Sequence, residues 1–401
     1  MKSILCFFAT LFPFILGAQN IQPVAVNNNQ FAFKLFRQEL GGNKGENLFL
    51  SPFSISTAMA MVYAGARNET ALQMSQTMNF ARGEHFHNDF RQLLTALNHG
   101  VEGPIELNIA NGLWAQQGYN FLDSYFNVVK TEYKSELKNV DFTADISREA
   151  TRKEINSWVA QETHDKIQDI LGRGDLSQST KLVLVNAIYF YGDWDSPFEK
   201  QATKPKPFYL HEGNPLTVPF MNKGGRYAYF EDSTLQAIEI PYKDNKVSMV
   251  IFLPAKSFAM TGFEKTFDVA EYGKIMGSMK TEEVTISLPK FQTTCKLSLS
   301  QDLTEMGMPL AFSGSADFSG MTGKRDLCIS DVIHQAFIRV DEQGTEAAAA
   351  TAVIMKMMAV RNPAEPKYFN ADHPFLFLIR DNATGSILFM GKIAKPGLLV
   401  P

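Results

Sequence analysis

The sequence predicts an α+β fold built as one large domain. Segments with helical apolar spacing dominate the first half of the chain, and strand-like apolar runs dominate the second half. The two kinds of segment do not alternate as they do in a doubly wound sheet, which favours α+β over α/β. No linker rich in Pro, Gly or Ser, no charge block and no repeat interrupts residues 25–401. We therefore expect a single domain over residues 19–401.

The helices come first in chain order. Apolar residues three or four positions apart predict helices over residues 30–36, 55–64, 86–97 and 150–162. Each segment carries polar residues between the apolar ones, as a helix packed on a core by one face does. All four predicted helices therefore precede residue 181 in the chain.

The strands follow. Residues 181–190 are apolar at nearly every position, which predicts a strand covered on both faces of its sheet. Five further runs predict strands over residues 247–254, 284–288, 332–340, 375–379 and 387–390. Residues 380–385 carry Asp, Asn and Gly between the last two runs, which predicts a hairpin turn.

Composition and charge exclude several classes of function. The chain of 401 residues is 45% hydrophobic and 20% charged, which is ordinary for a globular protein. Its net charge of −4 argues against a nucleic-acid-binding protein, which needs a concentrated positive field. No segment after the N-terminus approaches 18 uninterrupted apolar residues, so we expect no membrane association.

The N-terminus has the pattern of a secretory signal peptide. Residues 1–18 contain one Lys, an apolar run and a small-residue end at Gly17-Ala18. We therefore expect a secreted, extracellular protein cleaved near Ala18. Two acceptor triplets, at Asn68 and Asn382, fit this compartment and predict glycosylation. The two cysteines that remain, Cys295 and Cys328, are too few for a disulfide scaffold, and the sequence leaves open whether they pair.

Motifs of catalysis and metal binding are absent. The chain has no G-x-S-x-G, no H-E-x-x-H, no C-x-x-C and no complete phosphate-binding loop. His85 and His87 form the one close histidine pair, and their spacing on a helix predicts a solvated face rather than a metal site. We expect no enzyme, no metal and no cofactor. A hydrolase that uses a serine and His334 would need catalytic turnover to support it.

One segment is unusual in length and pattern. More than 30 residues, 341–374, separate two apolar strands, and loops of that length are commonly functional. If the segment became a strand, one face would carry no charge from Thr345 to Met357, while Glu346 and Lys356 would share the other face. The pattern fits insertion into a sheet. An exposed Ala-rich helix fits the composition equally well.

Several blocks of the sequence resemble the serpin family in both composition and order. They are residues 47–55 (NLFLSPFSI), 185–194 (VNAIYFYGDW), 288–291 (LPKF), 342–351 (EQGTEAAAAT) and 369–377 (FNADHPFLF). The resemblance covers nearly the whole mature chain. It implies three β-sheets, eight or nine helices and an exposed reactive-centre loop at about residues 342–366.

The resemblance assigns roles to polar residues that are otherwise plain. Four of them match the family's shutter, where the central sheet parts: Ser51, Ser54, Asn186 and His334. Three match the breach at the top of that sheet: Trp194, Lys290 and Glu342. A Lys290–Glu342 pair would tether the hinge of the loop. The hinge itself comprises Glu342, Gly344, Thr345, Glu346, Ala347, Ala348, Ala349, Ala350 and Thr351.

The family's mechanism gives this loop its expected function. A serine protease attacks the loop and becomes acylated, the hinge inserts into the central sheet, and the trapped acyl-enzyme fails to hydrolyse. Family spacing places the cut at Met358–Ala359, which suits an elastase, chymotrypsin or cathepsin G type. A longer stretch before Pro374 than in the shortest members leaves Lys356 or Arg361, and hence trypsin-like specificity, as alternatives.

The resemblance also bears on partners. Heparin-activated serpins carry basic residues along an early helix, and residues 70–80 have none, so we expect no heparin control by this route. We expect a monomer. A non-inhibitory serpin, acting as a carrier or chaperone, is the alternative function. Bulky or charged hinge residues would favour that alternative, and Glu346 is the one charge between Thr345 and Ile354.

Overall fold

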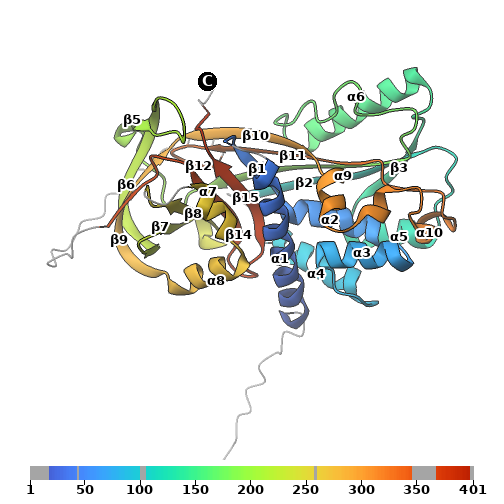
Figure 1. Cartoon of the computed structure of the whole chain (residues 1–401), viewed down its shortest axis with the longest axis horizontal. Coiled ribbons are helices and arrows are strands. Elements are labelled where there is room, and N and C mark those ends of the chain that lie inside the picture. Colours follow the sequence, from blue (N-terminus) through green and yellow to red (C-terminus); the bar gives the residue numbers. More distant parts are fainter. Residues whose placement is uncertain (1–17, 43–44, 100–104, 257–259, 346–366, 398–401) are drawn as a thin grey trace, which may run out of the picture.

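The computed structural model describes residues 18–42, 45–99, 105–256, 260–345 and 367–397 (Figure 1). Residues 1–17 of the expected leader lie outside these ranges. The α+β fold is confirmed: helices and antiparallel-rich sheets segregate along the chain. Among the described residues, no helix is long and apolar enough to cross a membrane.

Ten α-helices occur in the described part of the chain. They are α1 (Ala18–Gly42), α2 (Pro52–Tyr63), α3 (Asn68–Met78), α4 (Phe86–His99), α5 (Asp123–Tyr133), α6 (Asp145–Glu162), α7 (Met260–Thr266), α8 (Val269–Ser278), α9 (Ser300–Glu305) and α10 (Ser319–Thr322). Short 3₁₀ turns cover Lys200–Ala202, Lys243–Asn245 and Pro309–Phe312. The expected number of eight or nine is corrected to ten, because α7, α9 and α10 have seven residues or fewer.

The strands form two hydrogen-bonded sheets in the described residues. The first has six strands in the order β10-β11-β12-β4-β2-β3: β10 (Phe291–Ser298), β11 (Asp331–Val340), β12 (Gly344–Thr345), β4 (Leu182–Asp193), β2 (Ile105–Gln116) and β3 (Glu136–Val140). β11 and β4 also pair directly, in parallel, from Asp331–Phe337 to Val183–Tyr189. We call this parallel boundary the seam.

The second sheet has nine strands. Their order is β1-β15-β14-β8-β7-β6-β9-β13, with β5 on β6: β1 (Leu48–Leu50), β15 (Ile387–Ile393), β14 (Phe375–Asp381), β8 (Val247–Pro254), β7 (Leu235–Pro241), β6 (Leu216–Glu231), β9 (Lys280–Pro289), β13 (Lys367–Asn370) and β5 (Lys204–Phe208). The expectation of three separate sheets is corrected here. β6 is 16 residues long and pairs with β5 over residues 216–220, with β9 over residues 220–229 and with β7 over residues 228–231, and so joins two expected sheets.

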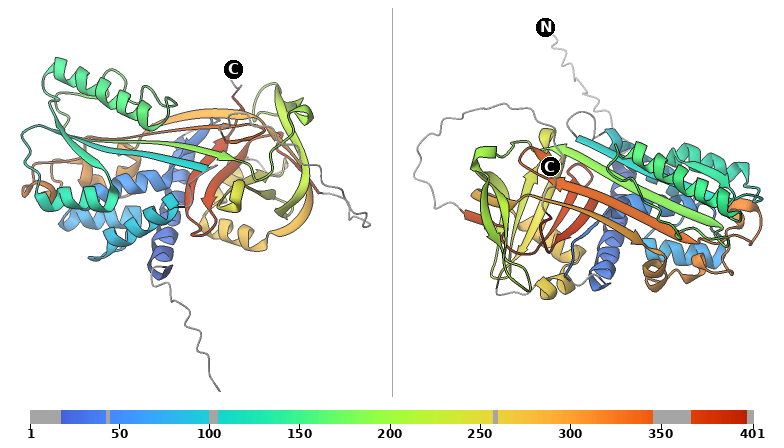
Figure 2. Two further views of the ribbon diagram at one scale, coloured as in Figure 1. Left: turned by 180° about the vertical axis from the view of Figure 1, so that it is seen from behind. Right: turned by 90° about the horizontal axis from the view of Figure 1, so that it is seen from above.

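The six-stranded sheet lies between two helical layers. α6 lies across one face, and α2 to α5 lie on the other (Figures 1 and 2). Side chains of β4 alternate accordingly. Val183 and Val185 join the smaller core beneath α6, whereas Leu184 and Ile188 join the main core. The strand is therefore buried on both faces, as its continuous apolar sequence predicts.

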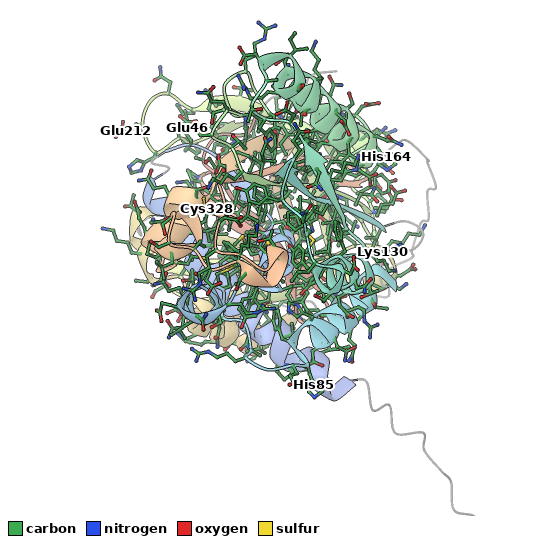
Figure 3. The ribbon with its side chains drawn as sticks, turned by 90° about the vertical axis from the view of Figure 1, so that its right-hand side faces the viewer. Glu46, His85, Lys130, His164, Glu212 and Cys328 are labelled. Atoms are coloured by element: carbon green, nitrogen blue, oxygen red, sulfur yellow. The ribbon has the colours of Figure 1, made fainter. Side chains whose placement is uncertain are left out.

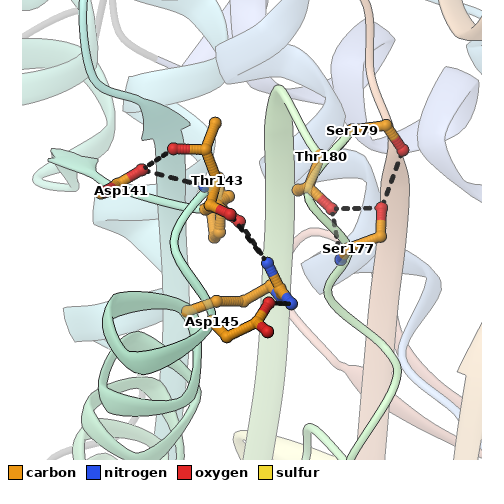
Figure 4. A network of polar contacts seen from close by, with 8 residues as sticks. Asp141, Thr143, Asp145, Ser177, Ser179 and Thr180 are labelled. Atoms are coloured by element: carbon orange, nitrogen blue, oxygen red, sulfur yellow. Dashed lines mark hydrogen bonds and ion pairs between the residues drawn. The ribbon is translucent and has the colours of Figure 1, made fainter.

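The connections around α6 are pinned by polar side chains (Figure 4). Asp141 accepts hydrogen bonds from the backbone N–H of Thr143 at 2.9 Å and from its hydroxyl at 2.5 Å. Arg148 is paired with Asp145 in the first turn of the helix. After the helix, the backbone N–H of Ser177 donates to Thr180 Oγ1 at 2.9 Å. These turns hold α6 over the sheet.

α2 starts inside the molecule because its sequence caps it well. Ser51 precedes the first turn in extended conformation, and its hydroxyl accepts a hydrogen bond from the Ser54 N–H at 3.1 Å. Pro52 occupies the first helical position, where its missing N–H costs nothing. The helix is buried nearly throughout its length. This arrangement fixes Ser51 and Ser54 against the central sheet.

Candidate functional site

The hinge begins inside the sheet. Gly344 and Thr345 pair antiparallel with Asp193 and Gly192 of β4, and Thr345 also pairs with Val340 of β11. β12 therefore fills the upper end of the boundary between β4 and β11, above the seam. The expectation of a loop exposed from residue 342 is corrected for its first residues, because Glu342, Gly344 and Thr345 are buried.

Only glycine fits at position 344. A Cβ atom there would stand 2.0 Å from the carbonyl oxygen of Gly192 and 2.8 Å from Cα of Asp193. These obstacles are backbone atoms, which cannot rotate away. The close approach of β12 to β4 thus depends on the absence of a side chain at Gly344.

Thr345 faces the core. Its side chain is 0% exposed, and its hydroxyl lies 2.6 Å from the hydroxyl of Tyr242. Burial raises the pKa of Tyr242 far above its usual value, so the phenol stays protonated and available for this bond. Trp194 stacks on the Tyr242 ring with centroids 4.5 Å apart. Thr345, the first residue on the uncharged face of the hinge, is therefore buried with its hydroxyl hydrogen-bonded.

Trp194, Lys290 and Glu342 come together at the top of the sheet. Lys290 Nζ lies 2.7 Å from Glu342 Oε2, and the hydroxyl of Thr203 donates to Glu342 Oε1 at 2.8 Å. The Trp194 indole N–H donates to the Asp341 carbonyl at 3.1 Å. The chain entering the hinge is thereby held by both its side chains and its backbone.

The charge of Glu342 depends on these contacts. Burial alone would raise its pKa, but the hydrogen bonds from Lys290 and Thr203 outweigh burial, and the pKa lies below its usual value. Glu342 is therefore ionised at neutral pH and pairs with the Lys290 ammonium. Removing Lys290 would leave a buried carboxylate with one side-chain donor.

The four shutter residues of the sequence analysis lie in one network at the middle of the seam. The backbone N–H of Ser51 donates to His334 Nε2 at 3.1 Å, and the hydroxyl of Ser51 donates to the Leu388 carbonyl at 2.7 Å. His334 Nδ1 is bonded to Asn186 Oδ1, and Asn186 Nδ2 donates to Ser54 Oγ. His334 and Asn186 are partners in the β4–β11 register, so their bond crosses the seam.

This network fixes the form of His334. The ring accepts at Nε2 from Ser51, so Nδ1 carries the proton that bonds Asn186. Burial lowers the pKa of His334 to about 3, against a smaller opposing effect of Asn186. The imidazole is thus neutral at physiological pH. Protonation at Nε2 would set two N–H donors against each other at the start of α2.

Three further residues hydrogen-bond to these sites, and no pattern in the sequence identifies them. Asn111 of β2 accepts a hydrogen bond from Asn186 Nδ2 and extends the shutter to a third strand. Thr203 and Tyr242 complete the sites of Glu342 and Thr345. Asn111 could have been found only by aligning β2 with β4, because its register partner is Asn186.

The rest of the expected loop lies outside the described residues. This applies to the hinge from Glu346 through Ala347, Ala348, Ala349 and Ala350 to Thr351. It also applies to the expected cut at Met358–Ala359 and to the alternatives Lys356 and Arg361. The described chain resumes at β13, which pairs in parallel with β9.

The two expected glycosylation residues are engaged in hydrogen bonds. Asn68 Nδ2 donates to Asp317 Oδ2 at 2.7 Å. Asn382 Nδ2 donates to the Asn245 carbonyl at 3.0 Å and to Ser248 Oγ at 2.8 Å. A glycan on either nitrogen would replace one of its hydrogens, so attachment at Asn382 would remove one of these bonds.

The remaining cysteines and histidines are dispersed. Cys295 and Cys328 are free thiols, and no cluster of metal-ligating side chains occurs among the described residues. Figure 3 shows Cys328, His85 and His164 at separate places. The expectation of a solvated face is wrong for His87, whose Nδ1 lies 2.6 Å from the buried Tyr133 hydroxyl. Burial lowers the pKa of His87 to about 4.

Comparison with known proteins agrees with this geometry. Residues 26–396 match the family model described as Serpin (serine protease inhibitor). A leukocyte elastase inhibitor of Xenopus laevis is 42% identical over 91% of this chain and 97% of its own length. The human protein of that name is also 42% identical, over 92% of this chain and 98% of its own length.

Solved structures share the fold. Human thyroxine-binding globulin complexed with thyroxine superposes with a TM-score of 0.85 at 29% identity, covering 94% of this chain and all of the other. Uncleaved ovalbumin gives a TM-score of 0.84 at 27% identity, covering 93% of this chain and all of the other.

Proposed function

This chain belongs to the serpin family, and we propose that it is a secreted suicide-substrate inhibitor of serine proteases. The observation that carries the proposal is the position of Gly344 and Thr345 between β4 and β11. The hinge already points into the boundary that an inserted strand would occupy. The following residues, Glu346 to Thr351, are small except for Glu346 and contain no proline.

Insertion would extend β12 along the seam, from Gly192 towards Val183 of β4. The 14 residues from Thr345 to Met358 would form a strand of about 46 Å. A protease acylated at Met358 would be carried that distance, which is comparable to the length of the sheet. Distortion of its active site would then prevent hydrolysis of the acyl bond.

Exchange of strand pairings supplies the driving force. Insertion would break the parallel pairing of Asp331–Phe337 with Val183–Tyr189. In its place, the new strand would pair antiparallel on both sides, as Thr345 already does. A dozen additional backbone hydrogen bonds at about 1 kcal/mol each equal the stability of an ordinary domain. The uncleaved form is therefore held by a kinetic barrier.

The expected specificity is for an apolar primary residue. Cleavage at Met358–Ala359 would suit an elastase, chymotrypsin or cathepsin G type of protease. The leukocyte elastase inhibitors among the relatives support this preference. Lys356 or Arg361 would instead direct the loop to a trypsin-like protease.

The alternative is a non-inhibitory serpin acting as a carrier or chaperone. The similarity to thyroxine-binding globulin raises this alternative, because that structure contains thyroxine. The hinge argues against it, since small residues follow Thr345 and permit insertion. Export rests on residues 1–18 alone, and N-terminal sequencing of protein recovered from the medium of an expressing cell tests it.

Incubation with proteases tests the proposal. Purified protein is mixed separately with chymotrypsin, neutrophil elastase and trypsin, and the products are separated on denaturing gels. We expect a covalent complex and a released peptide that begins at Ala359. A complex with a different peptide start moves the specificity to Lys356 or Arg361. Cleavage without any complex across a broad protease panel contradicts inhibition and supports the carrier function.

A further inference from the structure

His373 lies in the connection between β13 and β14, and both of its ring nitrogens face an acceptor. Nδ1 lies 2.7 Å from Asp372 Oδ1, and Nε2 lies 2.7 Å from the Pro254 carbonyl oxygen at the end of β8. The ring is largely buried, with 16% of its side chain exposed. A neutral imidazole has one N–H and satisfies one of these acceptors, whereas an imidazolium satisfies both.

Neither acceptor supplies a second proton. A carbonyl oxygen only accepts, and Asp372 Oδ2 also accepts from Lys256 Nζ at 2.8 Å and from Asn370 Nδ2 at 3.0 Å. Burial alone would raise the pKa of Asp372, but the hydrogen bonds from His373 and Lys256 outweigh burial, and the pKa lies below its usual value. Asp372 is therefore an ionised acceptor, and the contacts of His373 fit an imidazolium.

The chain around His373 is bonded to three other segments. β13 pairs in parallel with β9, and directly after β13 the Ala371 N–H donates to the Ser287 carbonyl at 2.9 Å. The Tyr209 N–H, which follows β5, donates to the Asp372 carbonyl at 2.7 Å. The ring of His373 adds the end of β8. Together these bonds hold the first described residues after the hinge.

Chain length shows what depends on these bonds. β9 and β12 lie toward the same end of the molecule (Figure 1). Insertion of the hinge as far as residue 358 without cleavage would leave the following residues to return about 46 Å to that end. The eight residues 359–366 reach at most about 29 Å. The 14 residues 359–372 reach about 50 Å, but that stretch includes β13. Insertion of the uncleaved chain therefore requires β13 to leave β9.

We propose that His373 is a pH-sensitive anchor: as an imidazolium it ties the chain after β13 to the end of β8, and loss of its proton allows β13 to separate from β9. Without that proton, one ring nitrogen faces an oxygen lone pair and the positive charge beside Asp372 is gone. The anchor is thus complete at low pH and weakens as the pH rises. Its effect on β13 stands alone, whereas its effect on inhibitory lifetime rests on the proposed function.

Few other groups near the anchor change charge in the physiological range, where histidine ordinarily titrates. The ionisable side chains that the structure joins to it are Asp372, Lys256 and Tyr209, and Lys256 Nζ lies 4.6 Å from the centroid of the Tyr209 ring. Burial lowers the pKa of His334 to about 3 and that of His87 to about 4, so both stay neutral near pH 7. A response between pH 6 and pH 8 therefore distinguishes the anchor from the shutter.

Amide hydrogen exchange of the full-length protein tests the anchor. Peptides that cover β13 are followed by mass spectrometry at pH 6 and pH 8, and each rate is divided by the intrinsic rate at that pH. We expect protection in the wild type to fall at least fivefold at the higher pH. His373→Arg keeps a cation with several N–H donors at both pH values and should stay protected. His373→Gln has no charge and should be weakly protected at both.

His85→Gln, at an exposed histidine, is the matched control and should respond to pH as the wild type does. Protection that is independent of pH in the wild type overturns the proposal. A fall in His373→Arg or in His373→Gln as large as in the wild type overturns it too, because the response would then come from another group.

The consequence for inhibition is measured as the time over which uncleaved protein, held at constant temperature, loses the ability to form a covalent protease complex. We expect the wild type to lose it at least threefold faster at pH 8 than at pH 6, and His373→Arg to lose it equally slowly at both. A pH response of exchange without one of lifetime overturns the link to insertion. Failure of fresh protein to form any complex refutes the proposed function, while the exchange result still decides the anchor.

Discussion

The breach and the shutter lie on the same strand boundary but are built differently. At the breach, β4 and β11 are already separated by Gly344 and Thr345, and an ion pair with a buried carboxylate holds the entering chain. At the shutter, the same strands are paired directly, and a fully buried neutral network joins them at His334 and Asn186. In the proposed insertion, the first region would guide the incoming strand, whereas the second would determine how much energy is needed to part the sheet.

The largest effect is expected where a charge is placed on the inward hinge face. Thr345→Arg would put a guanidinium into a site that is 0% exposed, at a cost of several kcal/mol. We expect insertion to fail, so that the protease cleaves the variant and leaves, and the stoichiometry of inhibition rises at least tenfold. Titration of residual protease activity measures it.

Ala348→Arg is the matched control, because in an inserted strand residue 348 would share the face of Glu346. It should retain inhibition close to that of the wild type. An equal loss of inhibition in both variants would contradict the assignment of an inward face. It would mean that the segment has no face specialised for insertion.

The second effect concerns the shutter. His334→Ala removes the side-chain partner of the Ser51 N–H and of Asn186 Oδ1 and opens a cavity, which costs about 2–4 kcal/mol. We expect the uncleaved protein to lose inhibitory activity on warming at least tenfold faster. The matching Lys290→Met variant should change this lifetime less. The reverse ranking would overturn the division of roles between the two regions.

The third prediction is the pH dependence of the shutter. The pKa of His334 is about 3 in the folded protein and about 6.5 in an unfolded chain. Its contribution to stability is therefore complete above pH 6.5 and is lost as the pH falls towards 3, by about 1.4 kcal/mol per pH unit. Denaturation midpoints of wild type and His334→Gln should converge as the pH falls through this range. A constant difference between them would refute the assignment.

The smallest effect is expected at the ion pair of the breach. Lys290→Met leaves the buried Glu342 carboxyl without its cation and with one side-chain donor, while Glu342→Gln keeps the hydrogen bond from Thr203. We expect Lys290→Met to destabilise by about 1–3 kcal/mol and the double variant to recover part of that loss. A double-mutant cycle in denaturant measures the coupling. Simple additivity would mean that the pair does not tether the hinge.

Local sequence predicts most elements of this fold. The uninterrupted apolar run of β4 predicts a buried strand, and the Asp, Asn and Gly residues between β14 and β15 predict a hairpin turn. β2 has no comparable signal, because its sequence mixes Asn, Gly and Trp with aliphatic residues and lies in the half of the chain where helical spacing dominates. The strand is specified by its pairing with β4, which is a long-range contact.

The candidate site divides in the same way. Family resemblance identifies Ser51, Asn186 and His334, but no local pattern distinguishes Asn111 or Tyr242 from ordinary surface or core residues. Burial decides their role, since a buried hydroxyl or amide needs a partner. Asn111 and Tyr242 acquire partners only when β2, β4 and the hinge have assembled.

A removable lock across the seam tests the central claim most directly. Ala187 and Gln335 are register partners, so Ala187→Cys/Gln335→Cys, in a Cys295→Ser/Cys328→Ser background, permits a disulfide between β4 and β11. The oxidised protein should be cleaved by the target protease without forming a covalent complex, and reduction should restore complex formation. Complex formation by the oxidised protein at the wild-type level would contradict insertion along this seam.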